Sequence, residues 1–283
     1  EAKRNGRNRF EFYDVRFDEE SDEKFSLIQR LRPAVQANAL AVYYQPLIDL
    51  KTGNICALEA LLRWPQEDGS MIFPDKFIPL AESSGLIDTL GAWVLNQACM
   101  FCAKQQQNGN SELSIAVNLS FAQFKDGNLP QIVKGALETS QLAPEHLELE
   151  LTESILADDN GNVIQQLEQI KSLGVTFAID DFGTGYSNLN YLRTFSAQKL
   201  KIDRIFINTL GFDEKDVPLV TAIISIAESL GMATVAEGIE NEAALKKITE
   251  MGCDIGQGYY WSKPVPAEQI ERLIEAQSPT NQR

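Results

Sequence analysis

Short apolar runs alternate with stretches of helical periodicity along almost the whole chain. We predict eight strands, at residues 42–48, 55–64, 113–119, 146–151, 175–180, 199–203, 232–236 and 253–257. Strands that alternate with helices in this way are typical of a TIM-like (β/α)8 barrel in the α/β class. The main alternative, a doubly wound sheet, normally carries a glycine-rich loop after its first strand. The sequence has no such loop, so we favour the barrel.

The predicted strands have one apolar face and one polar face. Run 146–151 places its leucines on one side and Glu148 and Glu150 on the other, and run 114–119 places Asn118 opposite apolar residues. In a barrel the apolar face packs against the surrounding helices. We therefore expect the polar side chains to point inwards, and those near the strand ends to reach the mouth.

A polar residue stands at the end of each strand from the second onwards: Glu59, Asn118, Glu150, Asp180 with Asp181, Lys201, Glu237 and Gln257. Their average separation of about 33 residues equals about one strand-plus-helix unit. A single acid in such a place is most often a helix cap or a solvated group. Seven positions in phase are better explained by one shared rim.

Five carboxylates at one mouth would repel strongly unless they bind protons or metal ions. An all-oxygen donor set with one Asn amide suits Mg²⁺ or Mn²⁺ rather than Zn²⁺. Asp180 and Asp181 can both face one site only where the strand breaks, and we expect residues 182–185 to supply that break. A carboxylate that bridges two ions is common in two-metal phosphodiester chemistry.

Composition excludes several other classes of protein. Lys and Arg number 25 against 40 Asp and Glu, a formal net charge of −15 that disfavours binding to a nucleic-acid polymer or an anionic membrane. Uncharged runs reach only about ten residues where a membrane span needs about 20, so we expect no membrane contact by this segment and a cytoplasmic location. Regions before residue 1 could still tether the parent protein.

Other catalytic chemistries lack their residues. His146 is the only histidine, so Ser-His-Asp and Cys-His sites are excluded, and we interpret Cys99 and Cys102 as buried free thiols in a helix. The tripeptide Asp181-Phe182-Gly183 also occurs in protein kinases, but the other kinase motifs are missing. Arg63 shares a strand face with Glu59, which places a guanidinium beyond an expected metal ligand, where it suits a phosphate oxygen.

Seven motifs together resemble those of the EAL-domain phosphodiesterases: Glu59-Ala-Leu-Leu-Arg-Trp64, Val117-Asn-Leu-Ser120, Glu150-Leu-Thr-Glu153, Asp180-Asp-Phe-Gly-Thr-Gly185, Leu200-Lys-Ile-Asp203, Val235-Ala-Glu-Gly238 and Gln257-Gly-Tyr-Tyr260. The resemblance spans roughly residues 27–277. It implies a TIM-like barrel with an antiparallel first strand, which hydrolyses cyclic di-GMP to linear pGpG with two Mg²⁺ or Mn²⁺ ions.

The resemblance also implies a ligand set: Glu59, Asn118, Glu150 and Asp180 for the first ion, and Asp180, Asp181 and Glu237 for the second. The larger Ca²⁺ is expected to inhibit. A non-catalytic cyclic di-GMP receptor, and an enzyme acting on another phosphodiester, are the alternatives to this interpretation.

Further roles follow from matching positions in the same family. Lys201 would contact the attacking water, Glu237 would serve as general base or second-ion ligand, and Gln257 would orient the water network. Glu153 would steady loop 182–189. The substrate would be held by Arg63, Gln45 and Leu61.

The N-terminal segment 2–10 resembles the extreme C-terminus of a GGDEF domain. We therefore predict that residues 1–25 are the tail of a preceding GGDEF domain with its linker, and that residues 26–283 form the EAL domain. The segment 186–192 has the aromatic and apolar content of the family's dimer contact, so we expect a homodimer.

Overall fold

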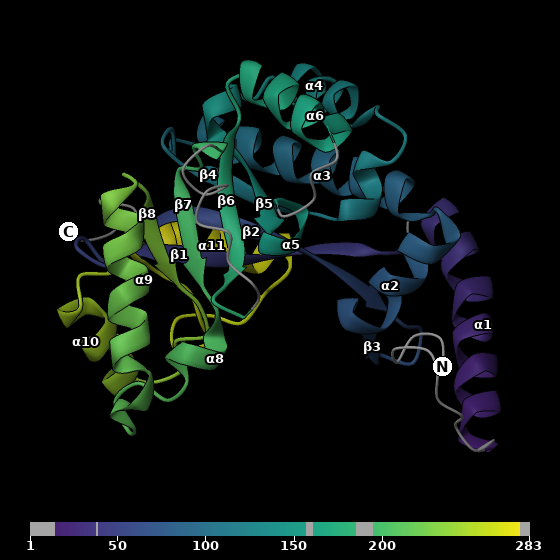
Figure 1. The fold of residues 1–283 in the computed structure, drawn as a ribbon. Coiled ribbons are helices and arrows are strands. Elements are labelled where there is room, and N and C mark those ends of the chain that lie inside the picture. The colour runs from purple at the N-terminus through teal and green to yellow at the C-terminus, as the bar shows by residue number, and fades with distance from the viewer. Residues whose placement is uncertain (1–14, 38, 157–160, 185–194, 278–283) are drawn as a thin grey trace.

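The computed structural model of the chain describes residues 15–37, 39–156, 161–184 and 195–277, and these residues form a closed barrel surrounded by helices (Figure 1). The described strands are β1 (Ala41–Asp49), β2 (Ile55–Pro65), β3 (Met71–Ile72), β4 (Ser114–Leu119), β5 (Leu147–Thr152), β6 (Thr176–Phe182), β7 (Lys199–Ile202), β8 (Ala233–Ala236) and β9 (Ile255–Gly256). Every predicted strand is present. The short β3, which pairs with the end of β2, was not predicted.

The strand order β1-β9-β8-β7-β6-β5-β4-β2 closes on itself because β1 also pairs with β2. Neighbouring strands from β2 through β9 run parallel, whereas β1 is antiparallel to both β2 and β9. The barrel and its antiparallel first strand are therefore confirmed. Because the parallel strands share one direction, their C-terminal ends gather at one mouth.

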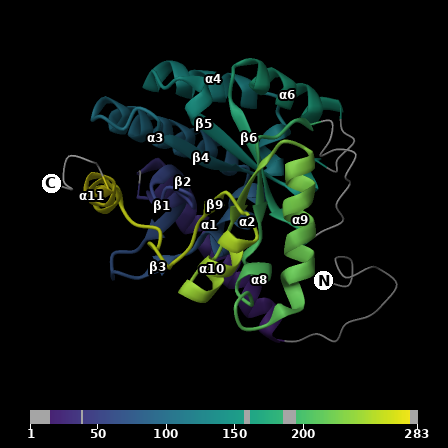
Figure 2. The same cartoon turned by 90° about the vertical axis from the view of Figure 1, so that its left-hand side faces the viewer.

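The described α-helices are α1 (Val15–Gln36), α2 (Pro74–Ser84), α3 (Ile87–Gln107), α4 (Leu129–Ser140), α5 (Glu153–Leu156), α6 (Gly161–Ser172), α8 (Arg204–Ile207), α9 (Val217–Ser229), α10 (Glu242–Glu250) and α11 (Ala267–Gln277). Helices α3, α4 and α6 lie together on one side of the barrel, away from α9 and α10 (Figures 1 and 2). Within the described ranges, no helix combines the length and the apolar character that crossing a membrane requires.

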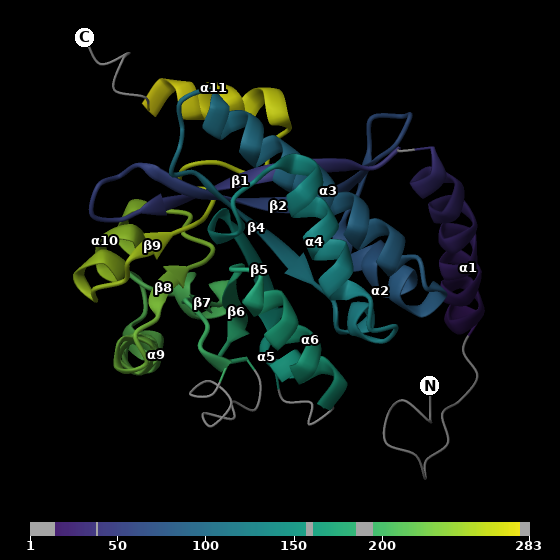
Figure 3. The same ribbon diagram turned by 90° about the horizontal axis from the view of Figure 1, so that it is seen from above.

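Helix α1 spans Val15–Gln36, so it includes part of segment 1–25, which we predicted to be a domain tail with its linker. Residues 15–25 include five acidic residues, and so many charged residues give no apolar periodicity from which a helix can be predicted. The helix packs against α2 at the edge of the molecule (Figures 1 and 3), where the Arg30 guanidinium lies 5.6 Å from the Trp64 ring centroid.

The strands bury apolar residues on the outside of the barrel and polar residues inside it. Leu147, Leu149 and Leu151 are fully buried against the helices, as expected for the apolar face of β5. On the opposite face Glu148 and Glu150 are also buried. Lys199 pairs with Glu148 at 2.9 Å, so the barrel interior is built from charged pairs as well as small apolar side chains.

Candidate active site

A buried lysine stands at the centre of the predicted rim. Lys201, on β7, has a side chain that is 1% exposed, and four carboxylates from other parts of the barrel surround its Nζ. The distances from Nζ are 2.6 Å to Glu150 Oε2, 2.7 Å to Glu237 Oε1, 3.3 Å to Asp180 Oδ1 and 3.9 Å to Glu59 Oε1. Residues from β2, β5, β6, β7 and the segment after β8 thus meet at one point, as the strand-end pattern predicted.

Amide side chains fix the position of Glu59. Asn118 Nδ2 donates to Glu59 Oε1 at 2.6 Å, and Gln257 Nε2 donates to Glu59 Oε2 at 2.5 Å. Gln257 Nε2 also lies 3.1 Å from Gln45 Oε1, and Gln45 Nε2 donates to the Ser262 carbonyl oxygen. The three amides therefore connect β1, β4 and the end of β9 to one carboxylate on β2.

Strand β6 ends at the predicted segment 182–185, but the irregularity that orients the two Asp side chains lies before it. Strand β6 continues to Phe182, and its register against β7 shifts between Ile179 and Phe182, which makes Asp180 and Asp181 a bulge. Asp181 has φ 55°, a left-handed conformation that is uncommon outside glycine. Its N–H donates to Asp180 Oδ1 at 3.0 Å. The bulge, rather than residues 182–185, turns both carboxylates to the mouth.

Two glycines allow the loops that carry Glu237 and Gln257 to approach their neighbours. A Cβ on Gly258 would lie 2.1 Å from the backbone oxygen of Ile239, so no other residue fits between Gln257 and that segment. Gly238 has φ 70°, and a Cβ there would lie 2.5 Å from the Arg204 Cβ. Both loops are thus held close to the barrel axis.

Asp203 is a site residue that our sequence analysis missed. It lies two residues after Lys201, is 9% exposed, and lines the same cavity as Asp180 and Asp181. Its carboxylate caps α8 by accepting from the Ile205 N–H at 2.7 Å. A hydrogen bond to Asp181 joins it to the acidic cluster. The sequence did contain a signal for Asp203: it lies two residues after Lys201, and residues two apart on a strand share a face.

The cluster keeps its lysine charged. Burial alone would lower the pKa of Lys201, but Asp180, Glu150, Glu237 and Glu59 raise it well above its ordinary value. Burial opposes ionisation of Glu59 too, yet Lys201 and the hydrogen bonds from Gln257 and Asn118 hold its pKa below the usual range. Lys201 and Glu59 are therefore an ionised pair at neutral pH.

Other carboxylates in the cluster retain protons more readily. Burial, assisted by the charges of Glu59 and Asp180, raises the pKa of Glu150 well above its ordinary value despite Lys201. Burial likewise raises the pKa of Glu237 to about 8. Partial burial and the charge of Asp180 raise the pKa of Asp181 to about 6. The metal-free cluster has more negative charge than one lysine can balance.

The same residues fit a divalent metal ion. Ligand oxygen atoms of Asp180, Asp181 and Glu237 all lie within 4.8 Å of one another. Glu150 Oε1 and Gln257 Oε1 are buried, and neither has a hydrogen-bond partner among the described residues. Buried polar atoms normally have partners. Oxygen atoms that lack partners beside a carboxylate cluster match the hard-cation preference of Mg²⁺ and Mn²⁺.

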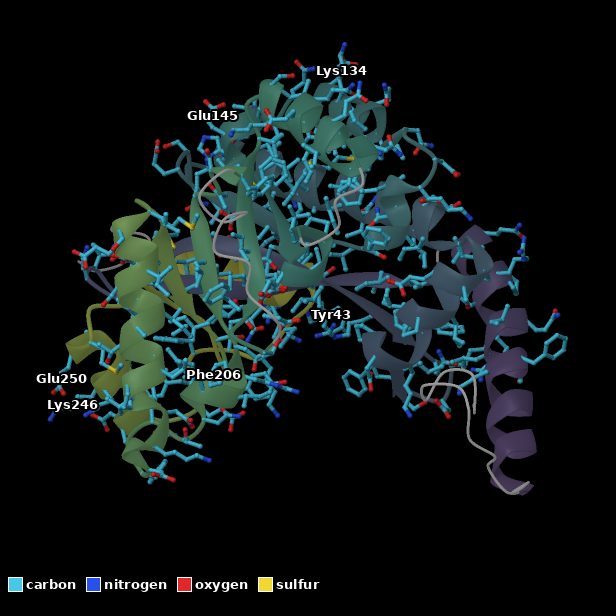
Figure 4. All side chains as sticks on the ribbon, viewed as in Figure 1. Tyr43, Lys134, Glu145, Phe206, Lys246 and Glu250 are labelled. Carbon is cyan, nitrogen blue, oxygen red and sulfur yellow. The ribbon has the colours of Figure 1, made fainter. Side chains whose placement is uncertain are left out.

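A cavity of about 410 Å³ opens over the cluster, and its lining includes Gln45, Leu61 and Arg63 as well as the acidic residues. Arg63 is half-buried and donates from Nη1 to the Leu62 carbonyl oxygen at 2.8 Å. Tyr43, labelled in Figure 4, is the residue of β1 that pairs with Leu61 of β2. The cavity thus joins an acidic floor to a basic and apolar wall.

Several predicted features lie outside this cluster. Glu153 is at the start of α5, and both of its carboxylate oxygens are buried without a partner among the described residues. Much of the loop that it was predicted to steady, and all of segment 186–192, lie outside the described residues. His146 Nδ1 is 3.3 Å from Ser114 Oγ at the opposite end of the barrel.

The cysteine prediction is confirmed. Cys99 and Cys102 are both free and buried on α3. Burial raises the pKa of each thiol to about 12, so neither thiol forms a reactive thiolate at neutral pH. The pair contributes to packing between α3 and the barrel.

The structure combines a closed barrel, an antiparallel first strand and a cluster of carboxylates around a buried lysine at the mouth. This combination defines a distinct class of α/β protein. The sequence model of the EAL domain matches residues 28–264, and the chain belongs to the EAL-domain family.

Two relatives illustrate the family. The chain is 41% identical over 269 residues to the bifunctional diguanylate cyclase/cyclic di-GMP phosphodiesterase MucR of Pseudomonas aeruginosa, a match that covers 95% of this chain and 39% of MucR. It is 37% identical over 276 residues to the cyclic di-GMP phosphodiesterase NbdA of the same organism, covering 98% of this chain and 35% of NbdA. The chain therefore spans little more than a third of the length of these relatives.

Two solved structures share the fold. The PaMucR phosphodiesterase in complex with c-di-GMP superposes with a TM-score of 0.83 at 42% identity, covering 87% of this chain and 99% of that one. The EAL enzyme Bd1971, in its cAMP and cyclic-di-GMP bound form, gives a TM-score of 0.85 at 32% identity, covering 90% of this chain and 70% of that one.

Proposed function

We propose that the chain is a metal-dependent phosphodiesterase that hydrolyses cyclic di-GMP to linear pGpG with two divalent ions. The observation that carries this proposal is the convergence of Glu59, Glu150, Asp180 and Glu237 on one fully buried lysine beneath an open cavity. The names of MucR and NbdA, and the c-di-GMP complex of the MucR domain, support the choice of substrate.

The donor set divides into two overlapping groups. Glu59, Asn118, Glu150 and Asp180 would hold the first ion. Glu150 Oε1, which is buried and has no hydrogen-bond partner among the described residues, would be one of the metal ligands. Asp180, Asp181 and Glu237 would hold the second, and their close oxygen atoms favour Glu237 as a ligand rather than only a base. Asn118 now turns its Nδ2 to Glu59, so its amide would rotate to present oxygen.

Bound Mg²⁺ or Mn²⁺ would supply Lewis-acid stabilisation of the phosphodiester and lower the pKa of water. The chain's own residues orient the reactants. Lys201 is held protonated, so it can donate a hydrogen bond to the attacking water while it stays bound to Glu150. Gln257 Oε1, which has no hydrogen-bond partner in the part of the chain that the structure describes, can accept a hydrogen bond from the same water network.

Charge at the mouth favours an anionic substrate only after metal binding. When ionised, seven carboxylates stand against the three positive charges of Lys201, Arg63 and Arg204. The carboxylates belong to Glu59, Glu150, Asp180, Asp181, Asp203, Glu237 and Glu240. Two divalent ions would bring the total to neutrality. Arg63, together with Gln45 and Leu61, then lies on the wall where it can hold the substrate phosphate and ribose.

Chromatography of cyclic di-GMP incubated with the chain tests this proposal. We expect conversion to pGpG with Mg²⁺ or Mn²⁺ and none in EDTA. Binding of cyclic di-GMP without turnover would support a receptor instead. Faster hydrolysis of a different phosphodiester in direct competition would indicate another substrate.

We also propose the wider arrangement that the sequence suggested. Residues 1–25 would be the end of a preceding GGDEF domain, in line with the bifunctional name of MucR, and segment 186–192 would contribute to a homodimer. If so, specific activity should rise with protein concentration in parallel with dimer mass in light scattering. A fully active monomer would refute the link between assembly and activity.

A further inference from the structure

Phe73 is a large aromatic residue that the fold leaves exposed beside the active site. Its side chain lies between β3 and α2 and is 55% exposed, whereas the nearby Trp64 and Phe77 pack edge to face in the core. The Arg63 guanidinium lies 6.0 Å from the Phe73 ring centroid, within the range of a cation–π contact. Arg63 itself lines the acidic cavity.

The backbone around Phe73 is fixed from both sides. Ile72, the preceding residue, pairs with Trp64 in the β2–β3 ladder, and Pro74, the following residue, is the first residue of α2. Phe73 is extended at the helix N-cap, with φ −84° and ψ 157°. A ring held in this way loses little additional entropy when a ligand stacks on it.

A second, mainly apolar cavity lies beside the acidic one and reaches the residue next to Phe73. Leu61 and Asn118 line the acidic cavity and also this second cavity of about 380 Å³. Pro74, the neighbour of Phe73, lines this second cavity as well. A ligand whose phosphate contacts Arg63 would therefore have the exposed Phe73 ring within reach of its adjacent groups.

We propose that Phe73 is a stacking platform for one purine base of the substrate, and that it thereby contributes to substrate preference. This inference rests on the proposed cyclic dinucleotide substrate. Such a substrate carries a planar base beside a phosphodiester, so Arg63 can contact the phosphate while Phe73 contacts the base. Aromatic rings stack on the faces of nucleobases, and a purine offers a larger face than a pyrimidine. Phe73 acts on binding and not on the reacting atoms.

Substitution of Phe73 tests the proposal. Phe73→Ala should raise the KM for cyclic di-GMP about tenfold and leave kcat within about twofold, in line with the loss of one stacked base. Phe73→Trp should restore the low KM, whereas Phe73→Leu, which keeps apolar bulk without a ring, should not. Phe25→Ala removes a similarly exposed phenylalanine from α1 and should change neither constant. An unchanged KM in Phe73→Ala, or full rescue by leucine, would overturn the proposal.

Two further measurements separate this inference from the proposed function. Hydrolysis of bis(p-nitrophenyl) phosphate with Mn²⁺ involves no purine, so Phe73→Ala should leave it unchanged, and an equal loss on both substrates would overturn the stacking role. Equilibrium binding of cyclic di-GMP with Ca²⁺, which should neutralise the acidic cluster but inhibit turnover, does not depend on hydrolysis. In this measurement, a Kd about tenfold higher for Phe73→Ala than for the unmodified chain supports stacking. This result would stand even if the unmodified chain showed no turnover and the proposed enzymatic function were rejected.

Discussion

Lys201 Nζ lies 2.6 Å from Glu150 Oε2, and the two side chains are 1% and 0% exposed. A buried lysine held by such a contact is costly to remove, because its loss leaves the ionised Glu59 nearby buried and uncompensated. Glu237, Asp180 and Glu59 approach the same ammonium group. Lys201 therefore serves both the stability of the metal-free barrel and the chemistry at its mouth.

Lys201→Met should abolish turnover and destabilise the metal-free protein by about 3–5 kcal/mol at pH 8, as expected for a broken buried ion pair. Urea unfolding in EDTA measures this loss. Mg²⁺ should recover part of it, because the ions would replace the missing positive charge. Lys199→Met, which breaks the pair with Glu148 away from the cavity, is the matched control and should keep metal-dependent turnover.

Asp180→Asn should lower turnover at least about 100-fold, because even residues that only orient metal ligands contribute 10- to 100-fold. The change removes one negative charge from the residue expected to bridge both ions. Asp126→Asn, on an exposed surface, should leave activity unchanged. Similar activity in the two variants, measured by release of pGpG at saturating Mg²⁺, would show that Asp180 does not bridge the ions.

Apparent Mg²⁺ affinity should increase between about pH 6 and about pH 9, because the pKa of Asp181 is about 6 and that of Glu237 is about 8 in the metal-free chain. Below these values the carboxyls carry protons that the ion must displace. At pH 7 Glu237 is mostly protonated, so binding should release about one proton. Calorimetry in buffers of different ionisation enthalpy measures that release, and a heat independent of the buffer would contradict it.

Calcium should inhibit turnover that Mg²⁺ or Mn²⁺ supports. Ca²⁺ is larger and accepts looser, higher coordination than an in-line displacement across two closely spaced ions requires. A titration of Ca²⁺ against fixed Mg²⁺ measures the effect. Full activity with Ca²⁺ as the sole divalent ion would count against the two-ion arrangement.

The barrel could be predicted from the sequence because two of its features are local. Apolar and polar residues alternate along each strand, and a polar residue stands near the end of each strand from the second onwards. The same signals predicted that Glu59, Glu150, Lys201 and Glu237 would meet. They could not locate the bulge at Asp181, since a left-handed residue in mid-strand depends on how β6 pairs with β7. Phe73 was also missed, because only the fold reveals that an aromatic residue after a two-residue strand lies beside Arg63.

Hydrolysis of cyclic di-GMP in H₂¹⁸O, followed by mass spectrometry of the product, shows whether the chain catalyses attack by water on the phosphodiester. We expect pGpG with one ¹⁸O atom in its terminal phosphate, formed in Mg²⁺ or Mn²⁺ and absent in EDTA, because water attacks phosphorus and the 3′ oxygen leaves. Cyclic di-GMP that binds and is recovered intact with Mg²⁺ or Mn²⁺, or pGpG formed at an equal rate in EDTA, would contradict this expectation.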